Sequence, residues 1–401
     1  MILSQAKAEE IAVFTVSAGH SDRFDTPVGI GLDPITFEAD TNLVLYERVK
    51  KDKVPVTFQI EQQSCGRVLS WILSSVTKAG EKRKYVLEKG VRTYVDVITV
   101  KDGGDELLIR SGADKVMAYH YGVALPPQGV PYEFRRSGFI HPLWSPTGEV
   151  LTHIQPKDHY HHFGIWNPWT KVTFEGETID FWNLGEGKGA VRYKSLIAVT
   201  SGVLSGGFKV SQEHVVFKPG YEKIAMNELI NVKLWNVNDE SGKKVWLWDF
   251  TSTLNGASES PVVINEYRYA GFSIRATPEW NVNTSSILTS EGKTRKDGDG
   301  TTGRWMFCNG KAGGNLSGIL FLSYPANFNH PEPMRIWPES SHDVFMNFSP
   351  TKNKDWVIEA GKEYALRYRV VVYSGEMTAA RAEQYWQDFA NPPGIAVEIK
   401  Q

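Results

Sequence analysis

Turn signals divide most of this chain into short segments of strand-forming residues. Glycine-centred turns recur along its length, at LEKGV, KDGGD, SPTGE, FKPGY, DESGK and EAGKE. The runs between them, for example at 91–100, 243–256 and 362–375, are rich in β-branched and aromatic residues. The run at 243–256 also alternates large aromatic side chains with other residues, which is the period of a strand with two unlike faces. Many short strands joined by tight turns predict an all-β protein, a large antiparallel β-sandwich, rather than a parallel α/β sheet.

One segment near the C-terminus has a helical pattern instead. A single apolar face at 377–389 carries Ala379, Ala382, Trp386 and Phe389. Two prolines at 392–393 then prevent the helix from continuing. We therefore expect a C-terminal helix packed on the sandwich. A cupin-like barrel is the alternative fold, because it also places a His-x-His pair on a strand.

The length of the chain suggests more than one structural unit. Its 401 residues exceed the roughly 250–300 residues at which a single core usually stops growing. The polar, glycine-bearing stretch at 101–115 is the nearest thing to a boundary. We predict an N-terminal β-rich unit at 1–110, a main sandwich at 111–375, and a C-terminal helix and tail at 376–401.

Charge and hydropathy exclude several kinds of partner. The chain has 44 basic and 46 acidic residues and no long run of like charge, which argues against a nucleic-acid or anionic-membrane partner. No apolar run approaches the ~18 residues that a membrane helix needs. The two cysteines, Cys65 and Cys308, are expected to be free, buried thiols, with one long-range disulfide as the alternative. The N-terminus shows no signal peptide, so we expect either a cytoplasmic protein or one whose leader is absent from this sequence.

The most unusual segment is DHYHHFGIW, at 158–166, with three histidines and one aspartate in five residues. If the segment is extended, His159 and His161 share one face. The opposite face then carries Asp158, Tyr160 and His162. An extended segment would thus split the imidazoles between two sides of a sheet.

Three roles are open for this cluster. In acid–base catalysis one imidazole is the base, a second the acid and a third an orienting partner. In a metal site the His-x-His pair binds a divalent ion, completed by Asp158 or a distant carboxylate. In a structural role the rings are satisfied by backbone groups in a tight turn. The catalytic candidates are His159, His161, His162 and Asp158.

Residues suited to sugar recognition surround the cluster. Flat indoles stack on sugar rings, and amide or charged groups form hydrogen bonds with hydroxyls. The segment 327–348 adds a second polar and aromatic loop between prolines. The candidates for substrate binding are Trp166, Asn167, Trp169, Arg192, Glu266, His330, Arg335 and Trp337.

Several motifs are similar to those of a known family. DH-x-HH-x-G-x-W at 158–166 and N-x-x-HPEP at 327–333, with DFWNLGEGKG between them, resemble a bacterial family of unknown function labelled PmoA-like or "methane oxygenase". The resemblance covers about 110–375. It implies a secreted or periplasmic sandwich of the galactose-mutarotase-like type, from bacteria that degrade polysaccharide. Where the family usually has Arg after the paired histidines this chain has Phe163, and Arg335 stands where a histidine is common. Arg335 is therefore expected to bind an anionic or hydroxyl group.

Together these observations predict a carbohydrate-active enzyme that cleaves a glycosidic linkage, by hydrolysis or β-elimination, with histidine acid/base catalysis. The alternatives are a non-catalytic glycan-binding module and a His/Asp metal-dependent enzyme. The expected partner is a saccharide or glycoside, and the expected location is the periplasm or the outside of a bacterial cell. The one cofactor foreseen is a divalent metal at the histidine cluster.

Overall fold

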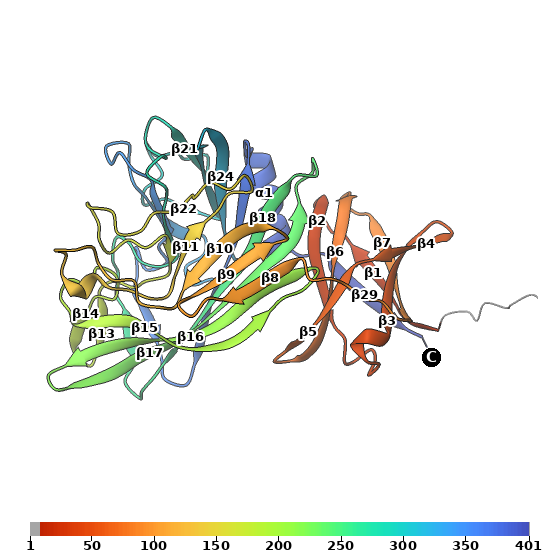
Figure 1. Cartoon of the computed structure of the whole chain (residues 1–401), viewed down its shortest axis with the longest axis horizontal. Helices are drawn as coiled ribbons and strands as arrows, with labels where there is room; N and C mark the ends of the chain where they lie inside the picture. The colour runs from red at the N-terminus through yellow and green to blue at the C-terminus, as the bar shows by residue number, and fades with distance from the viewer. Residues whose placement is uncertain (1–8, 401) are drawn as a thin grey trace, which may run out of the picture.

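A computed structural model describes residues 9–400 of the chain (Figure 1). Within that range the polypeptide forms five antiparallel sheets, one α-helix, α1 (Ala379–Ala390), and two 3-10 turns, η1 (Asp40–Asn42) and η2 (Tyr132–Phe134). None of the helices in this range is long and apolar enough to cross a membrane.

Two large sheets face each other and enclose the main core. The first has the order β15 (Gly189–Thr200), β16 (Ser205–Lys218), β17 (Tyr221–Asn238), β18 (Lys244–Gly256), β28 (Glu363–Ser374), β24 (Asn315–Ser323), β23 (Trp305–Ala312) and β21 (Ser285–Thr289). The second has the order β22 (Thr302–Gly303), β25 (Glu332–Ile336), β26 (Phe345–Phe348), β20 (Ser273–Arg275), β12 (Ile165–Trp166), β11 (Phe139–Leu143), β10 (Asp114–His120), β9 (Glu106–Ser111) and β8 (Ile98–Asp102). Side chains from both sheets form one continuous hydrophobic cluster, which confirms the predicted large antiparallel β-sandwich.

The alternation predicted at 243–256 sets the two faces of β18. Trp246 and Trp248 point into the main core, whereas Leu247 lies on the outer face against helix α1. The strands predicted at 243–256 and 362–375 are confirmed as β18 and β28, and the C-terminal helix as α1. At 91–100, by contrast, strand structure begins only at Ile98, because the preceding residues are largely exposed and form the connection between units.

A smaller unit is built on its own core at the N-terminal end. One sheet has the order β29 (Gly394–Ile399), β1 (Glu10–Ser17), β7 (Lys82–Lys89), β3 (Leu43–Val49) and β4 (Asp52–Val56). The other has the order β2 (Arg23–Gly31), β6 (Gly66–Thr77) and β5 (Phe58–Gln63). Their facing side chains enclose a second hydrophobic cluster centred on Trp71, Phe14 and Tyr85.

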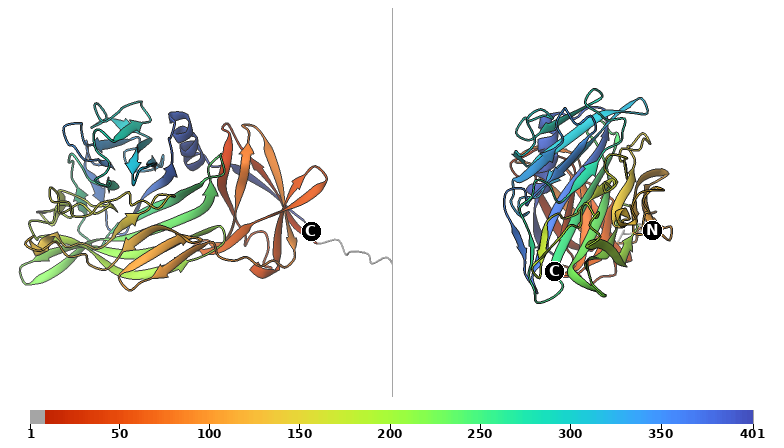
Figure 2. Two further views of the ribbon diagram at one scale, coloured as in Figure 1. Left: turned by 45° about the horizontal axis from the view of Figure 1, so that its top comes forward. Right: turned by 90° about the vertical axis from the view of Figure 1, so that its left-hand side faces the viewer.

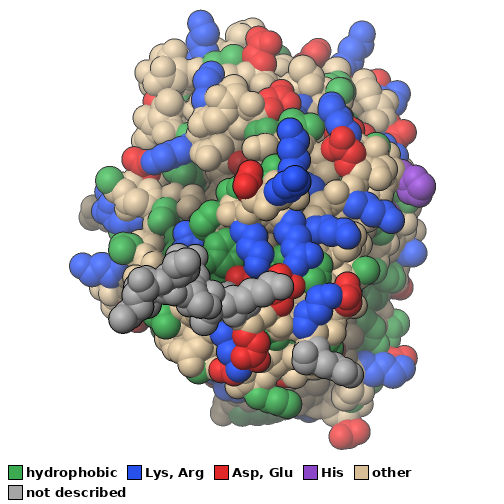
Figure 3. Space-filling view, turned by 90° about the vertical axis from the view of Figure 1, so that its right-hand side faces the viewer, with side chains coloured by type: hydrophobic (Ala, Val, Ile, Leu, Met, Phe, Trp, Pro, Cys, Tyr) green, Lys and Arg blue, Asp and Glu red, His purple; other side chains and the backbone are tan. Residues whose placement is uncertain are grey.

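The division of the chain differs from the predicted boundaries. Position 110 falls inside β9, which belongs to the large sandwich, and the last strand of the first pass through the small unit is β7. After helix α1 the chain returns to the small unit, where β29 pairs along β1 (Figure 2). The C-terminal tail is therefore a structural strand of the N-terminal unit. Seen from its free end, this unit presents Lys and Arg side chains with acidic side chains among them (Figure 3).

A fifth sheet closes one end of the sandwich, in the order β14 (Glu177–Ile179), β13 (Val172–Phe174), β19 (Val262–Ile264) and β27 (Trp356–Ile358). Both cysteines are free, as predicted, and Cys308 is buried, but the predicted burial of Cys65 is wrong because this residue is exposed.

Candidate functional site

The polar and aromatic residues of the candidate site lie at one edge of the nine-stranded sheet, where four strands begin or end. The strands β25, β26, β20 and β12 are neighbours and run antiparallel, so the ends of β25 and β20 meet the starts of β26 and β12 at the same edge. Arg275 ends β20, Phe345 begins β26, and Trp337 directly follows β25. The histidine segment leads into β12 at this edge. Sheet topology thus brings together residues more than 170 positions apart.

The histidine segment is a pair of turns rather than a strand. The amide of His159 donates to the carbonyl of Pro156 (2.9 Å), and that of His162 donates to the carbonyl of His159 (3.0 Å). The amide of Gln155 donates to the carbonyl of His162 (2.8 Å) and closes the loop. The extended segment predicted here is therefore wrong, and the imidazoles are not divided between two faces. The three rings lie together, with centroids 4.7 to 5.4 Å apart.

These rings face an open pocket with a volume of about 770 Å³. Two of its walls come from the histidine segment and from the loop after β25. The residues that line it are Asp158, His159, His161, His162, Trp182, Asn183, Arg268, Tyr269, Arg335, Trp337, Ser341, His342, Asp343 and Phe345. Of the twelve predicted site residues, this pocket brings together Asp158, the three histidines, Arg335 and Trp337.

A buried arginine joins the acidic residues of the pocket. Nη2 of Arg275 donates to both carboxylate oxygens of Asp158 (3.2 and 3.1 Å) and to Asp343. Each aspartate also accepts a hydrogen bond from the histidine next to it, at 2.8 Å from Nδ1 of His159 and 2.9 Å from Nδ1 of His342. The guanidinium of Arg275 lies 4.8 Å from the ring centre of Trp337. The pocket thus has two histidine–aspartate pairs that share one cation.

Burial determines the charge of the cluster. It lowers the pKa of His161 to about 3, helped by the nearby His159 and Arg136, and it holds the pKa of His162 well below the ordinary value. Burial alone would raise the pKa of Asp158, but the hydrogen bond from His159 and the charge of Arg275 lower it. His161 and His162 are therefore neutral near pH 7, so neither can be the acid partner expected within the cluster.

Three predicted sugar-binding residues lie inside the protein instead. Trp166 packs against Trp182 and the ring of His162, in a cluster behind the pocket wall. Asn167, the residue directly after β12, donates to the buried carboxylate of Glu228 (3.0 Å). Trp169 is fully buried in the main core. The structure does not place these three side chains among the pocket-lining residues.

The remaining three predicted residues lie outside this pocket. Arg192 sits on β15, where it pairs with two glutamates. Glu266 follows β19 and is exposed, and its backbone amide donates a hydrogen bond to the carboxylate of Asp355 (2.6 Å). His330 bonds through Nδ1 to the hydroxyl of Ser323 (3.1 Å) and stacks on Trp386 of helix α1.

Several residues that build the pocket were not among the twelve predicted site residues. Arg275 is not itself a lining residue but bonds to two of the lining carboxylates, and its one sequence signal is a charged residue that ends an apolar strand, GFSIR. Tyr269 and Asn183, whose side chains hydrogen-bond each other (3.2 Å), belong to separate loops. His342 and Asp343 are adjacent in the sequence, but only the fold shows that they face the first histidine–aspartate pair.

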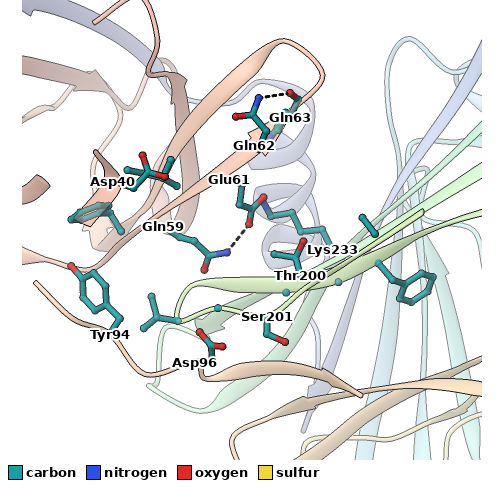
Figure 4. Close-up of a pocket in the computed structure, with 18 of the residues that line it drawn as sticks. Asp40, Gln59, Glu61, Gln62, Gln63, Tyr94, Asp96, Thr200, Ser201 and Lys233 are labelled. Carbon is teal, nitrogen blue, oxygen red and sulfur yellow. Dashed lines mark hydrogen bonds and ion pairs between the residues drawn. The ribbon is translucent and has the colours of Figure 1, made fainter. Parts of the chain in front are cut away.

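A second pocket, of about 660 Å³, lies between the two units (Figure 4). Its polar groups are largely engaged with one another. Gln59 donates to Glu61 (2.7 Å) and to the backbone of Ser205 (3.0 Å), and Glu61 pairs with Lys233 (2.7 Å). These bonds join the small unit to the large sandwich, so we regard this pocket as an interface and the histidine pocket as the candidate site.

Comparison with known proteins gives a family match without an activity. The model of a family of unknown function, DUF6807, matches residues 106–387. The sequence analysis predicted such a family, whereas the label PmoA-like stays a prediction. No curated protein matches the chain.

Solved structures give only distant likenesses. They include an α-mannosidase from Enterococcus faecalis V583 (TM-score 0.49, 8% identity, covering 98% of this chain and 46% of that one). A glycosyl hydrolase family 38 protein from Enterococcus faecalis follows (TM-score 0.47, 8% identity, 98% and 48%). A GH36 α-galactosidase from Geobacillus stearothermophilus is weaker (TM-score 0.31, 11% identity, 70% and 41%). This chain spans less than half the length of each, and likeness at this level assigns no function.

Proposed function

The chain belongs to DUF6807, a family of unknown function, and we propose from its site that it is a carbohydrate-active enzyme that cleaves a glycosidic linkage in the histidine pocket. The observation that carries this proposal is the arrangement of two histidine–aspartate pairs, bridged by Arg275, around a pocket large enough for a sugar ring. A purely structural arginine would not need two imidazoles directed into one open pocket.

The reacting proton is assigned to His342. Its Nδ1 bonds to Asp343, which fixes the orientation of the ring and leaves Nε2 as the nitrogen that can exchange a proton with a substrate or water. Asp343 is itself held by Arg275, so the pair has a fixed position relative to the histidine cluster. In a catalytic dyad a carboxylate positions, in the same way, the imidazole that transfers the proton.

The sugar itself is assigned to the aromatic and polar side chains of the pocket. Trp337 is partly exposed and offers an indole face beside His159. Tyr269 and Asn183 line the same pocket and add a phenol and an amide. Aromatic faces and amide groups are the usual means of holding a pyranose ring and its hydroxyls.

The test is a screen of oligosaccharides and aryl glycosides with product detection by mass spectrometry. His342→Asn should lower kcat by about 10²–10⁴-fold, the usual contribution of acid–base catalysis, with little change in KM. Trp337→Ala should mainly raise KM. Arg192→Ala, which alters a residue outside the pocket, is the matched control and should leave both constants unchanged. Saccharide binding without any product would instead identify a glycan-binding module.

A further inference from the structure

We propose that His159, His161 and His162 form a binding site for one divalent transition-metal ion. This inference deepens the proposed function, because it concerns the same pocket, but it is tested by metal binding alone. Imidazole nitrogens are ligands that suit Zn²⁺, Co²⁺, Ni²⁺ and Cu²⁺.

The spacing of the rings fits a tripod of imidazoles around one ion. A metal–nitrogen distance of about 2.1 Å places each ring centre about 3.2 Å from the ion, so tetrahedral angles put the three ring centres about 5 Å apart. The observed distances are 5.4 Å for His159 and His161, 4.7 Å for His159 and His162, and 4.8 Å for His161 and His162.

The nitrogen atoms are close to ligating distance. One ring nitrogen from each histidine lies within 4.8 Å of the other two. Three atoms at that separation are at most about 2.8 Å from a common centre, so an inward shift of about 0.7 Å reaches the usual metal–nitrogen distance. Small rotations of the side chains supply such a shift without any change in the backbone.

Neighbouring groups prepare the rings for this role. Asp158, ion-paired with Arg275, can only accept a hydrogen bond, so Nδ1 of His159 carries the proton and Nε2 keeps its lone pair. A carboxylate that orients a histidine in this way is the usual outer partner of a metal ligand. On the other side, Nδ1 of His162 is buried and has no hydrogen-bond partner among residues 9–400. An unpaired buried nitrogen is unfavourable, and coordination of an ion by the ring removes that unfavourable state.

The site would leave a coordination position open toward the substrate. His159 and His161 line the pocket, so an ion held by the triad faces the open volume rather than the core. Three protein ligands with one open position are typical of catalytic rather than structural zinc sites.

The experiment measures metal uptake by the full chain. Protein treated with a chelator and desalted is titrated with Zn²⁺ by calorimetry, and separately with Co²⁺ while the visible d–d spectrum is recorded. We expect one equivalent of either ion and a Co²⁺ spectrum typical of four- or five-coordinate nitrogen ligation. His161→Asn and His159→Asn should each weaken Zn²⁺ binding by at least 100-fold.

Two controls separate this proposal from the others. His330→Asn and His342→Asn alter histidines outside the triad and should keep one equivalent of Zn²⁺, although the second should lose catalysis. If wild-type protein takes up no stoichiometric ion, or if His159→Asn and His161→Asn both bind Zn²⁺ as tightly as wild type, the metal proposal is wrong. Stoichiometric binding with no saccharide turnover would overturn the proposed function and leave the metal site intact.

Discussion

Arg275 is a fully buried cation that holds two partly exposed carboxylates at the pocket wall. Substitution by Lys keeps the charge, but the shorter side chain does not carry its ammonium to the position of Nη2, which makes all the bonds to Asp158 and Asp343, and it has no planar group to stack on Trp337. Loss of hydrogen bonds to charged groups should lower the free energy of unfolding by about 1–3 kcal/mol. Urea denaturation measures this change.

Arg192 provides the matched control, because it also bridges two carboxylates but is about half exposed on β15. Exposed ion pairs contribute little, so Arg192→Lys should change stability by less than about 1 kcal/mol. If both substitutions lower the free energy of unfolding equally, burial does not strengthen the Arg275 bridge.

Glu332 gives a stability effect with a defined dependence on pH. Burial raises its pKa to about 7, although Ser323, Asn327 and Tyr368 all donate hydrogen bonds to it. The native state therefore keeps a proton that the unfolded chain releases above about pH 4.5. This contribution is complete below pH 4.5 and is lost as the pH rises through about 7, by on the order of 3 kcal/mol.

Glu332→Gln carries no ionisable proton, so this part of the pH dependence should disappear. Urea midpoints at pH 5 and pH 8 measure it: the wild type should lose more stability between these values than the variant does. Parallel curves for the two proteins would contradict a raised pKa at this position.

Single residues of the site could be predicted from sequence only where neighbours in the chain share the pocket. Asp158 and the three histidines lie in two consecutive turns, so their proximity in sequence is proximity in space. Trp166 does not line the pocket, because strand β12 turns it into the cluster behind the pocket. Arg275 was missed because its partners come from other strands.

At the scale of elements, the strands could be predicted and the functional loop could not. Strand β18 follows a period of two over 13 residues, and burial of both faces maintains it. The loop at 153–164 has no period, and its shape depends on bonds to distant strands, such as the amide of Arg275 donating to the carbonyl of Gly164 (2.8 Å). The secondary-structure propensities of single residues contain no information on such contacts.

Gly164 is the position on which this loop depends. Its φ is +54°, and a Cβ there would lie 2.2 Å from the carbonyl oxygen of Ile140. Gly164→Ala should therefore displace the loop, lower the free energy of unfolding by more than about 2 kcal/mol and disturb the histidine rings. Thermal unfolding and Zn²⁺ titration measure the two effects.

Gly176 is the matched control, because its φ is +79° and a Cβ there would meet no atom of the described residues within 4 Å apart from its chain neighbours. Gly176→Ala has the backbone penalty alone, about 1 kcal/mol, and should leave Zn²⁺ binding unchanged. A similar loss of stability for both variants would show that the close approach to Ile140 does not matter.

At the scale of the whole molecule, the chain crosses between the two units more than once. Helix α1 lies on the large sandwich, and the strand that follows it completes a sheet of the small unit. The helix and its proline stop were predictable, but the pairing of β29 with β1 was not. A strand of six mostly exposed residues carries no signal for a partner almost 400 positions away.

One buried ion pair links the two units, and its removal should affect both. Nη1 of Arg23, on β2, donates to Asp388 of helix α1 (2.9 Å), and Thr26 donates to the same carboxylate (3.1 Å). Both charged side chains are less than one tenth exposed. Asp388→Ala leaves the Arg23 cation buried without its partner, which should cost about 3–5 kcal/mol.

Arg23→Met with Asp388→Leu removes both charges and should cost less than the sum of the single changes, because no unpaired charge remains. Urea unfolding followed by tryptophan fluorescence reports both units, because Trp71 lies in the core of the small unit and most other tryptophans lie in the large sandwich. Removal of the exposed pair Lys78–Asp22 is the control and should have little effect on stability. We expect Asp388→Ala to make the small unit unfold in a first transition, at lower urea than the sandwich. If the losses of stability are strictly additive and both units still unfold in one transition, other contacts, such as those of β29, hold the units together.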